Sequence, residues 1–225
     1  MPDSGISAAT RESLGLTRAE FNALRRLDSP ARIQSFLNAI PINAEPDGDT
    51  LLSVRSVLAQ RRAHCMEGAM VAACAMWIHG RPPLVMRLGS SASDYPHVVA
   101  LFRHAQRWGA VSKTNGIALR FRDPVYVTLR ELAMSYFHEY SDKHGNKTLR
   151  TYSRAFDLRR IDVAHWVTRR DHCWLAHDTL EATRHYALID GKAEQALVRR
   201  DDFEREVAAI GQYPDPARPS ARPRR

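Results

Sequence analysis

The segment from Arg62 to Ile78 is the feature that most constrains this chain. It predicts a loop that becomes an apolar helix of small residues, with Cys65 at the helix start. The first backbone N–H groups of a helix have no intrahelical acceptors and the helix dipole is positive there, so both favour the thiolate form of a cysteine. Glu67 opposes this effect because its charge is negative. Cys65 is therefore a candidate nucleophile, whereas Cys74, flanked by small apolar residues, is more simply a core residue.

A histidine that can act as a base follows further along the chain. Residues 94–102 are typical of a strand, with His97 near its start. An imidazole is the base that a thiol nucleophile needs. His64 adjoins the thiol but is a weaker candidate, because consecutive residues on a helix point about 100° apart. We therefore predict that Cys65 and His97 form the functional pair.

The composition is that of an ordinary globular protein. The length of 225 residues suits one domain, or one domain with an appendage, and 44% of the residues are hydrophobic and 26% charged. No apolar run approaches the roughly 20 residues that span a bilayer. Residues 1–5 lack the basic and apolar regions of a secretory signal. We expect a cytoplasmic protein with no membrane partner.

The charge is concentrated at one end of the chain. The formal net charge is +8, but four positive charges lie in the tail, at Arg218, Arg222, Arg224 and Arg225. The folded part is thus only mildly basic, and no ribonucleoprotein motif, zinc-finger spacing or helix-turn-helix accompanies its arginine pairs. We expect nucleic acid to bind only weakly, through this Arg-rich tail. Three cysteines make no even framework, so free thiols are expected.

Three helices are predicted before the cysteine segment. A capping box of Thr17 and Glu20 starts the first helix. The second begins after Ser29, with proline at its first position, and stops at Pro41. The third follows Thr50 and leads into the cysteine segment.

After the cysteine helix the hydrophobic period changes to that of strands. A meander of three strands is predicted at residues 84–88, 97–102 and 108–113. The short link at residues 104–107 makes the last two strands an antiparallel hairpin. The residues opposite His97 should then fall between Ser112 and Asn115, so polar side chains are expected beside the histidine.

The rest of the chain is predicted to be mostly helical. A helical pattern follows Asp123-Pro124 and ends before the turn at residues 143–146. Further helices are predicted at residues 177–189 and 201–210. The tail from Pro214 is too rich in proline and arginine to pack, so we expect it to be disordered.

The order of these elements resembles the transglutaminase-like superfamily of papain-type thiol enzymes, over about residues 50–140. In that family the cysteine begins the central helix and the histidine lies on a strand of the adjacent antiparallel sheet. The resemblance implies an α+β fold in which helices pack on a small antiparallel sheet. Residues 1–49 and 141–213 are then helical extensions of this core, and residues 214–225 are a disordered Pro/Arg tail.

The resemblance also implies a third functional residue. In the family an aspartate or asparagine on the next strand orients the imidazole, and the aspartate usually follows a tryptophan by four residues. Four residues after Trp108 this chain has Ser112. A serine accepts an imidazole N–H bond but does not offset imidazolium charge. Asn115 is preferred for the role on hairpin position, and Asp123 has the better charge but lies beyond the strand.

What the resemblance implies about activity is acyl transfer or amide hydrolysis. The substrate would be a protein or peptide carrying a carboxamide or amide, and neither a cofactor nor a metal is expected. His172, Cys173 and His177 resemble a metal site in composition, and a single mixed site from these three residues is the weaker alternative. The alternative is an inactive interaction module that keeps the fold and binds an acidic partner or nucleic acid, an alternative that Ser112 and the tail favour.

Overall fold

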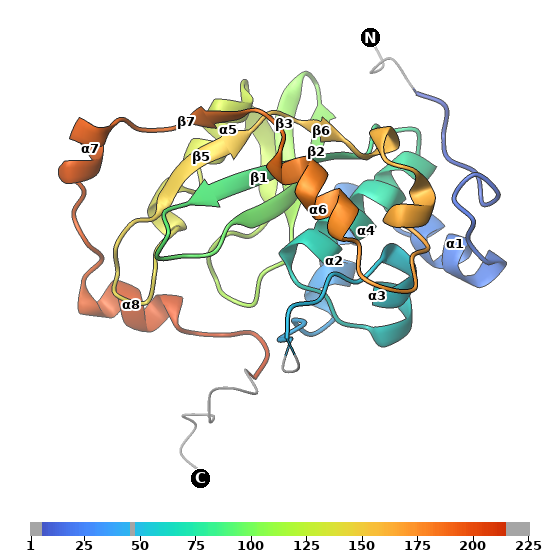
Figure 1. The fold of residues 1–225 in the computed structure, drawn as a ribbon, viewed down its shortest axis with the longest axis horizontal. Helices are drawn as coiled ribbons and strands as arrows, with labels where there is room; N and C mark the ends of the chain where they lie inside the picture. The colour runs from blue at the N-terminus through green and yellow to red at the C-terminus, as the bar shows by residue number, and fades with distance from the viewer. Residues whose placement is uncertain (1–5, 46–47, 215–225) are drawn as a thin grey trace.

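The computed structural model describes residues 6–45 and 48–214, and in them the chain forms eight α-helices and one seven-stranded antiparallel sheet (Figure 1). The helices are α1 Arg18–Arg25, α2 Pro30–Asn38, α3 Val54–Gln60, α4 Cys65–Ile78, α5 Leu129–Met134, α6 Trp174–Glu181, α7 Gly191–Gln195 and α8 Asp202–Ala208. The strands are β1 Leu84–Ser90, β2 His97–His104, β3 Arg107–Ser112, β4 Arg122–Tyr126, β5 Leu149–Ser153, β6 Phe156–Asp157 and β7 His185–Ala187. Three 3₁₀ turns complete the elements, η1 Phe137–Glu139, η2 Leu158–Arg160 and η3 Val163–His165.

The predicted helix starts of the N-terminal half are confirmed. The Thr17 side chain accepts a hydrogen bond from the Glu20 N–H at 3.3 Å, and the Glu20 carboxylate accepts one from the Thr17 N–H at 2.7 Å. The Ser29 side chain caps α2 by accepting a hydrogen bond from the Arg32 N–H at 3.3 Å. Because these caps satisfy donors that the helix itself leaves free, they fix where each helix begins.

The predicted meander of β1, β2 and β3 is also confirmed, and it forms the middle of the sheet. The strand order is β4-β3-β2-β1-β5-β7, and β6 pairs with one end of β1. Ala105 and Gln106 turn the β2–β3 hairpin with φ angles of 47° and 64°. Positive φ at both turn positions matches the right-handed twist of the paired strands.

The long helix predicted after Asp123-Pro124 is wrong. Residues 122–126 form β4 instead, and only the short α5 and η1 follow it. β4 is an edge strand, where the missing N–H of Pro124 leaves no ladder bond unmade within the sheet. The apolar residues of that pattern are buried all the same, because Leu132 and Phe137 pack under the sheet.

Residues 141–213 are not a purely helical extension. They contribute β5, which pairs with β1, and β7, which pairs with β5, as well as β6. The helix predicted at 177–189 is wrong in extent, since α6 ends at Glu181 and β7 follows. The helix predicted at 201–210 is confirmed as α8. The predicted disorder of residues 215–225 lies outside the described residues.

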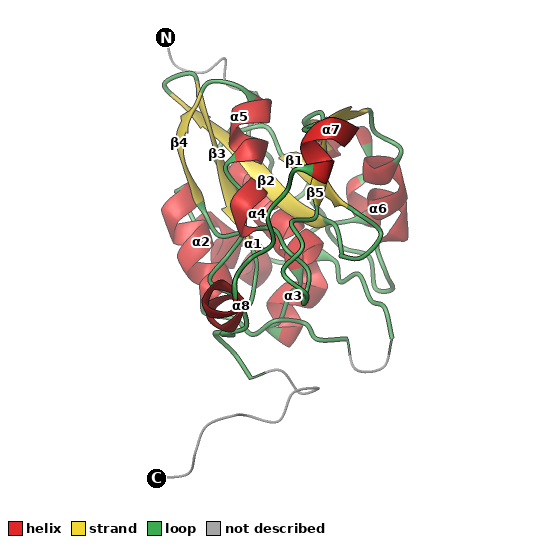
Figure 2. Cartoon of the chain, turned by 90° about the vertical axis from the view of Figure 1, so that its left-hand side faces the viewer, coloured by secondary structure: helices red, strands yellow, loops and turns green. Residues whose placement is uncertain are grey.

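The sheet separates two hydrophobic cores. On one face α4 packs against the sheet and is surrounded by α1, α2 and α3, and on the other face lie α5 and η1 (Figure 2). Twelve of the fourteen residues of α4 are buried, which explains why its sequence is apolar all round. No helix in the described part of the chain has the length and apolar character needed to cross a membrane.

A glycine lets α4 approach the sheet closely. A Cβ atom added at Gly68 would lie 2.5 Å from Cβ of Lys113, the residue that follows β3. No side chain fits at that distance, so glycine is the residue that this contact requires. The close approach brings the start of α4, with Cys65, to the same end of the sheet as the start of β2, with His97.

Candidate active site

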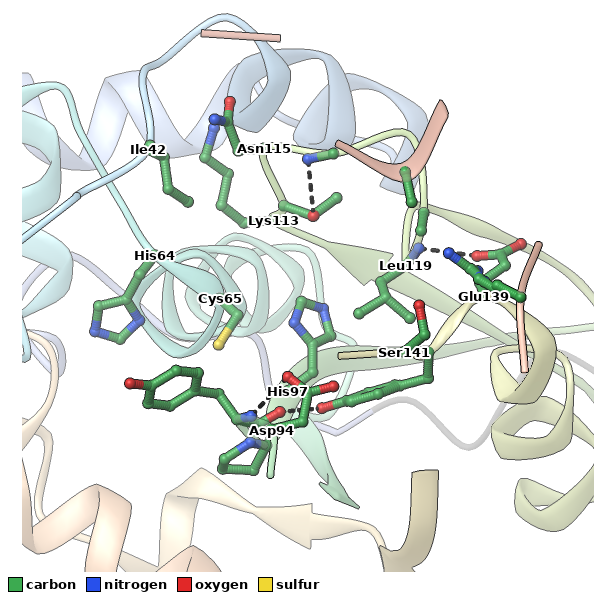
Figure 3. A pocket seen from close by; sticks show the side chains of 18 residues that line it. Ile42, His64, Cys65, Asp94, His97, Lys113, Asn115, Leu119, Glu139 and Ser141 are labelled. Carbon is green, nitrogen blue, oxygen red and sulfur yellow. Dashed lines mark hydrogen bonds between the residues drawn. The ribbon is translucent and has the colours of Figure 1, made fainter. Parts of the chain in front are cut away.

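A cavity of about 360 Å³ opens at the start of α4. Its walls come from the first residue of α4, the loop before β2, the segment after β3, the turn after η1 and the end of α8. Figure 3 shows Cys65 and His97 in its wall, and the thiol of Cys65 is within hydrogen-bond reach of the His97 side chain. The structure therefore brings together the two residues that the sequence analysis paired, from elements 32 positions apart in the chain.

The thiol of Cys65 differs from the other two thiols in its surroundings. Burial raises the pKa of Cys65, but hydrogen bonds and charge from His64 and His97 outweigh that effect and hold its pKa well below the ordinary value. Burial raises the pKa of Cys74, and it raises that of Cys173 to about 12. Cys65 is thus the thiol whose environment favours the thiolate at neutral pH.

A chain of hydrogen bonds decides the tautomer of His97. Nε2 of His97 lies 2.7 Å from Oγ of Ser112, and that hydroxyl donates its own proton to the carbonyl oxygen of Leu119. A carbonyl oxygen only accepts, and a serine hydroxyl has one proton to give. Nε2 of His97 must therefore carry the N–H, which leaves the lone pair of Nδ1 for a proton from Cys65.

Ser112 is held in place by a second set of contacts. Its backbone N–H donates to Oε1 of Gln34 at 2.9 Å, and its carbonyl oxygen accepts from Nε2 of Gln34 at 2.8 Å. Ser112 pairs directly with Val99 in the β2–β3 ladder. Val99 and His97 share a face of β2, so Ser112 is the diagonal neighbour of the histidine on that face.

Asn115, the residue preferred from the sequence as the partner of His97, forms its hydrogen bonds elsewhere. Its side-chain amide donates to the Tyr213 carbonyl at 3.0 Å and accepts from the Tyr213 N–H at 2.9 Å. It lies an odd number of residues beyond Ser112, after β3 has ended, so side-chain alternation does not direct it to the histidine. Asp123 is exposed on β4. Within the described residues the side chain of His97 bonds to Ser112 alone of the three candidates.

A second polar cluster, built from His64 and Glu67, lies on the other side of the thiol and was not predicted from the sequence. His64 is the N-cap of α4, with extended backbone angles of φ −90° and ψ −173°. The rule that neighbouring helical residues diverge does not apply to a residue that is not helical. The ring of His64 therefore turns back over the helix start, and Cys65 lies between the rings of His64 and His97 (Figure 3).

Glu67 anchors this second cluster. It is fully buried, and its carboxylate accepts hydrogen bonds from the backbone N–H groups of Leu52 and His64, both at 2.7 Å. The side-chain amide of Asn43 adds contacts at 3.1 and 3.2 Å. Burial outweighs the effects of His64 and these donors and raises the pKa of Glu67 above its ordinary value. The sequence signal for the cluster was the spacing of His64 and Glu67, which is that of a capping box.

The residues that resemble a metal site in composition make other contacts. Residues 6–45 and 48–214 contain no group of three or more His, Cys, Asp or Glu side chains placed to hold an ion. His172 accepts a hydrogen bond from the Leu51 N–H, the thiol of Cys173 faces the carbonyl oxygen of Trp166, and His177 contacts the neighbouring Asp178.

No protein-family model matches this chain, and no curated protein matches it either. A thiol with a low pKa, an imidazole with a free nitrogen lone pair and a helix start that offers N–H donors are the parts of a nucleophilic acyl-transfer site.

Proposed function

We propose that this protein is a transglutaminase-like thiol enzyme that transfers or hydrolyses an acyl group, with Cys65 as the nucleophile. The observation that carries the proposal is the placement of the Cys65 thiol between two histidines at the start of a buried helix, in an open cavity. The order of a helix with the cysteine, a strand with the histidine and a strand with its hydrogen-bond partner supports the same family.

The first half of the proposed reaction forms a thioester. The Cys65 proton passes to Nδ1 of His97, and the sulfur attacks the carbonyl carbon of a carboxamide or peptide amide. The negative charge that develops on the carbonyl oxygen faces the N–H of Cys65, which has no intrahelical acceptor at the first position of α4. The C–N bond then breaks, and the amine leaves with the proton that His97 returns to it.

The second half releases the acyl group. Water or a second amine gives a proton to Nδ1 of His97 as it attacks the thioester carbon, and the C–S bond breaks. The sulfur takes the proton back, so Cys65 and His97 end in their starting states. Ser112 keeps Nε2 of His97 as an N–H donor throughout, which holds Nδ1 toward the sulfur. Water gives hydrolysis, and an amine gives transfer.

The test is covalent capture of the acyl group. The wild-type protein is mixed with p-nitrophenyl acetate, an activated ester, and its intact mass and peptides are measured. We expect one acetyl group on Cys65, removable by hydroxylamine as a thioester is. Cys65→Ala should abolish it, and His97→Gln should slow it by about 100-fold or more, the usual contribution of a general base.

A protein that neither takes up an acetyl group on Cys65 nor releases p-nitrophenol faster than Cys65→Ala is neither a thiol acyltransferase nor a thiol hydrolase. The protein would then be better described as an inactive interaction module with this fold. Cys74→Ala is a matched control, because Cys74 lies on the same helix with its thiol fully buried, and that variant should acetylate at the wild-type rate.

A further inference from the structure

Two acidic side chains lie within ion-pair distance of His64. Nε2 of His64 is 3.4 Å from Oε1 of Glu67 and 3.8 Å from Oε1 of Glu45. No acidic side chain in residues 6–45 and 48–214 forms an ion pair with His97, whose ring bonds to the neutral Ser112. The ion pairs with a histidine in this site are thus those of His64, on the side of the thiol opposite to His97.

The hydrogen bonds around Glu67 are those of a carboxylate. Its two oxygens face N–H donors from Leu52, His64 and Asn43, and a protonated acid would need an acceptor where one of these donors stands. Glu67 is fully buried, and buried charges in proteins are as a rule paired with an opposite charge. His64 is the cationic side chain within ion-pair distance of it in the described residues.

The contacts of Nε2 of His64 suit the charged form, whereas Nδ1 is placed as in the neutral ring. Nε2 lies 3.2 Å from the carbonyl oxygen of Thr50, an acceptor for an N–H in either state. Burial lowers the pKa of His64, but Cys65, Glu67 and Glu45 together outweigh it and raise the pKa to about 9. Nδ1 accepts from the Met66 N–H at 3.2 Å only while it is unprotonated, so the cation exchanges this bond for one to the sulfur.

We propose that His64 is a second functional histidine, whose imidazolium, paired with Glu67 and Glu45, holds Cys65 as the thiolate while His97 carries the moving proton. This inference rests on the proposed role of Cys65 as the nucleophile. No bond to His64 forms or breaks, and its proton stays in place. Transfer of the thiol proton to His97 is then favoured by stabilising the thiolate, whereas an acid beside His97 would favour it by stabilising the imidazolium.

The pH dependence of Cys65 alkylation by iodoacetamide tests this assignment. In the wild type the rate should stay nearly constant from pH 8.5 down to about pH 6, because the thiolate persists. In His64→Gln the midpoint should rise by one pH unit or more, so the rate at pH 6 falls by about twofold or more while the rates at pH 9 converge. A purely structural role would lower the rate equally at every pH.

Several other titratable groups face the site and are controlled for. The charged or titratable neighbours are Glu67 on α4, Glu45 before α3, His97 on β2, Asp94 before β2, Tyr140 after η1 and Lys113 after β3. Burial lowers the pKa of Lys113 to about 8, within the range measured, so the profile is repeated in Lys113→Met. His79→Gln is the matched control, because His79 caps the far end of the same helix and bonds to the Arg25 carbonyl.

The outcomes separate the two proposals. If wild-type Cys65 reacts no faster than Cys173, the proposed function fails. If wild-type Cys65 is reactive and His64→Gln has the wild-type profile, only the role of His64 fails. Should His64→Gln not fold, imidazole NMR of the wild type decides: His64 should stay protonated up to pH about 9, and titration near the ordinary histidine value of about 6.5 would overturn the assignment.

Discussion

Ser112 accepts a hydrogen bond from Nε2 of His97 at 2.7 Å. Ser112 stands where the resemblance to the transglutaminase-like superfamily predicts an acid. The serine fixes the direction of the ring without adding charge. Because its hydroxyl proton is committed to the Leu119 carbonyl, the same contact also fixes the tautomer. Orientation and charge, which one aspartate would supply together, are thus divided between Ser112 on one side of Cys65 and the buried Glu67 on the other.

The Ser112 contact predicts how two neighbouring variants differ. Ser112→Ala removes the acceptor, and a lost hydrogen bond of about 1 kcal/mol corresponds to a fall of roughly fivefold to tenfold in the rate of Cys65 acetylation. Asn115→Ala should leave that rate within about twofold, because Asn115 binds Tyr213 and should instead loosen the C-terminal segment. Stopped-flow acetylation and limited proteolysis measure the two effects. Slower acetylation in Asn115→Ala than in Ser112→Ala would restore Asn115 as the orienting residue.

Lys113 predicts a pH dependence of stability. Its Nζ donates to the carbonyl oxygens of Leu37 at 3.0 Å and Ile40 at 2.6 Å, and burial lowers its pKa from 10.5 to about 8. Between these two values the unfolded chain binds more protons, so the contribution of Lys113 to stability rises with pH and is lost as the pH falls through about 8. The neutral amine of Lys113 has two N–H groups, which is enough to bond both carbonyl oxygens, so losing the proton costs neither contact.

The measurement is urea unfolding of the wild type and Lys113→Met from pH 7.5 to 10. The difference in unfolding free energy should move in favour of the wild type by at most about 1 kcal/mol per pH unit, a figure reduced for screening through the open cavity. A constant difference across this range would show that the ammonium is not perturbed.

Gly68 predicts a destabilising glycine-to-alanine change within a helix. Alanine is ordinarily the better helix former by about 1 kcal/mol, but here its Cβ would meet Cβ of Lys113 at 2.5 Å. Gly68→Ala should therefore push α4 away from the end of β3. This overpacking should cost about 1–3 kcal/mol of unfolding free energy and lower the melting temperature by several degrees. Gly191→Ala is the control, because nothing lies within 4 Å of a Cβ there. Equal melting temperatures for the two variants would refute the close contact.

Local signals in the sequence predicted the first half of the fold well. The caps at Thr17 and Ser29 act within one helical turn, so the residues that decide them are adjacent in the chain. β5 was missed because its place depends on pairing with β1, about 60 residues earlier, and strand formation depends on such neighbours more than on intrinsic propensity. Asp123-Pro124 was interpreted as a helix start because proline suits that position as well as it suits an edge strand.

The candidate site was predicted only in part, because some of its features depend on local sequence and others on packing between distant elements. Cys65 and His97 follow from the order of elements, which the sequence carries. The choice between Ser112 and Asn115 depends on side-chain alternation at the end of a strand, where an error of one residue reverses the face. The role of His64 depends on its extended N-cap backbone, and Glu67 was expected to oppose the thiolate because its own donors and His64 were not foreseen.

The most direct test of Cys65 as an activated nucleophile compares the alkylation rates of the three thiols in the native protein. A short pulse of iodoacetamide at pH 7, followed by peptide mapping, gives a rate for each cysteine. Cys65 should be alkylated at least about tenfold faster than Cys74 and Cys173, because theirs are buried thiols of raised pKa. Unfolding the protein should bring the three rates together. Alkylation of Cys65 at a rate no higher than that of Cys173 in the folded protein would contradict the activated thiol on which the proposed function depends.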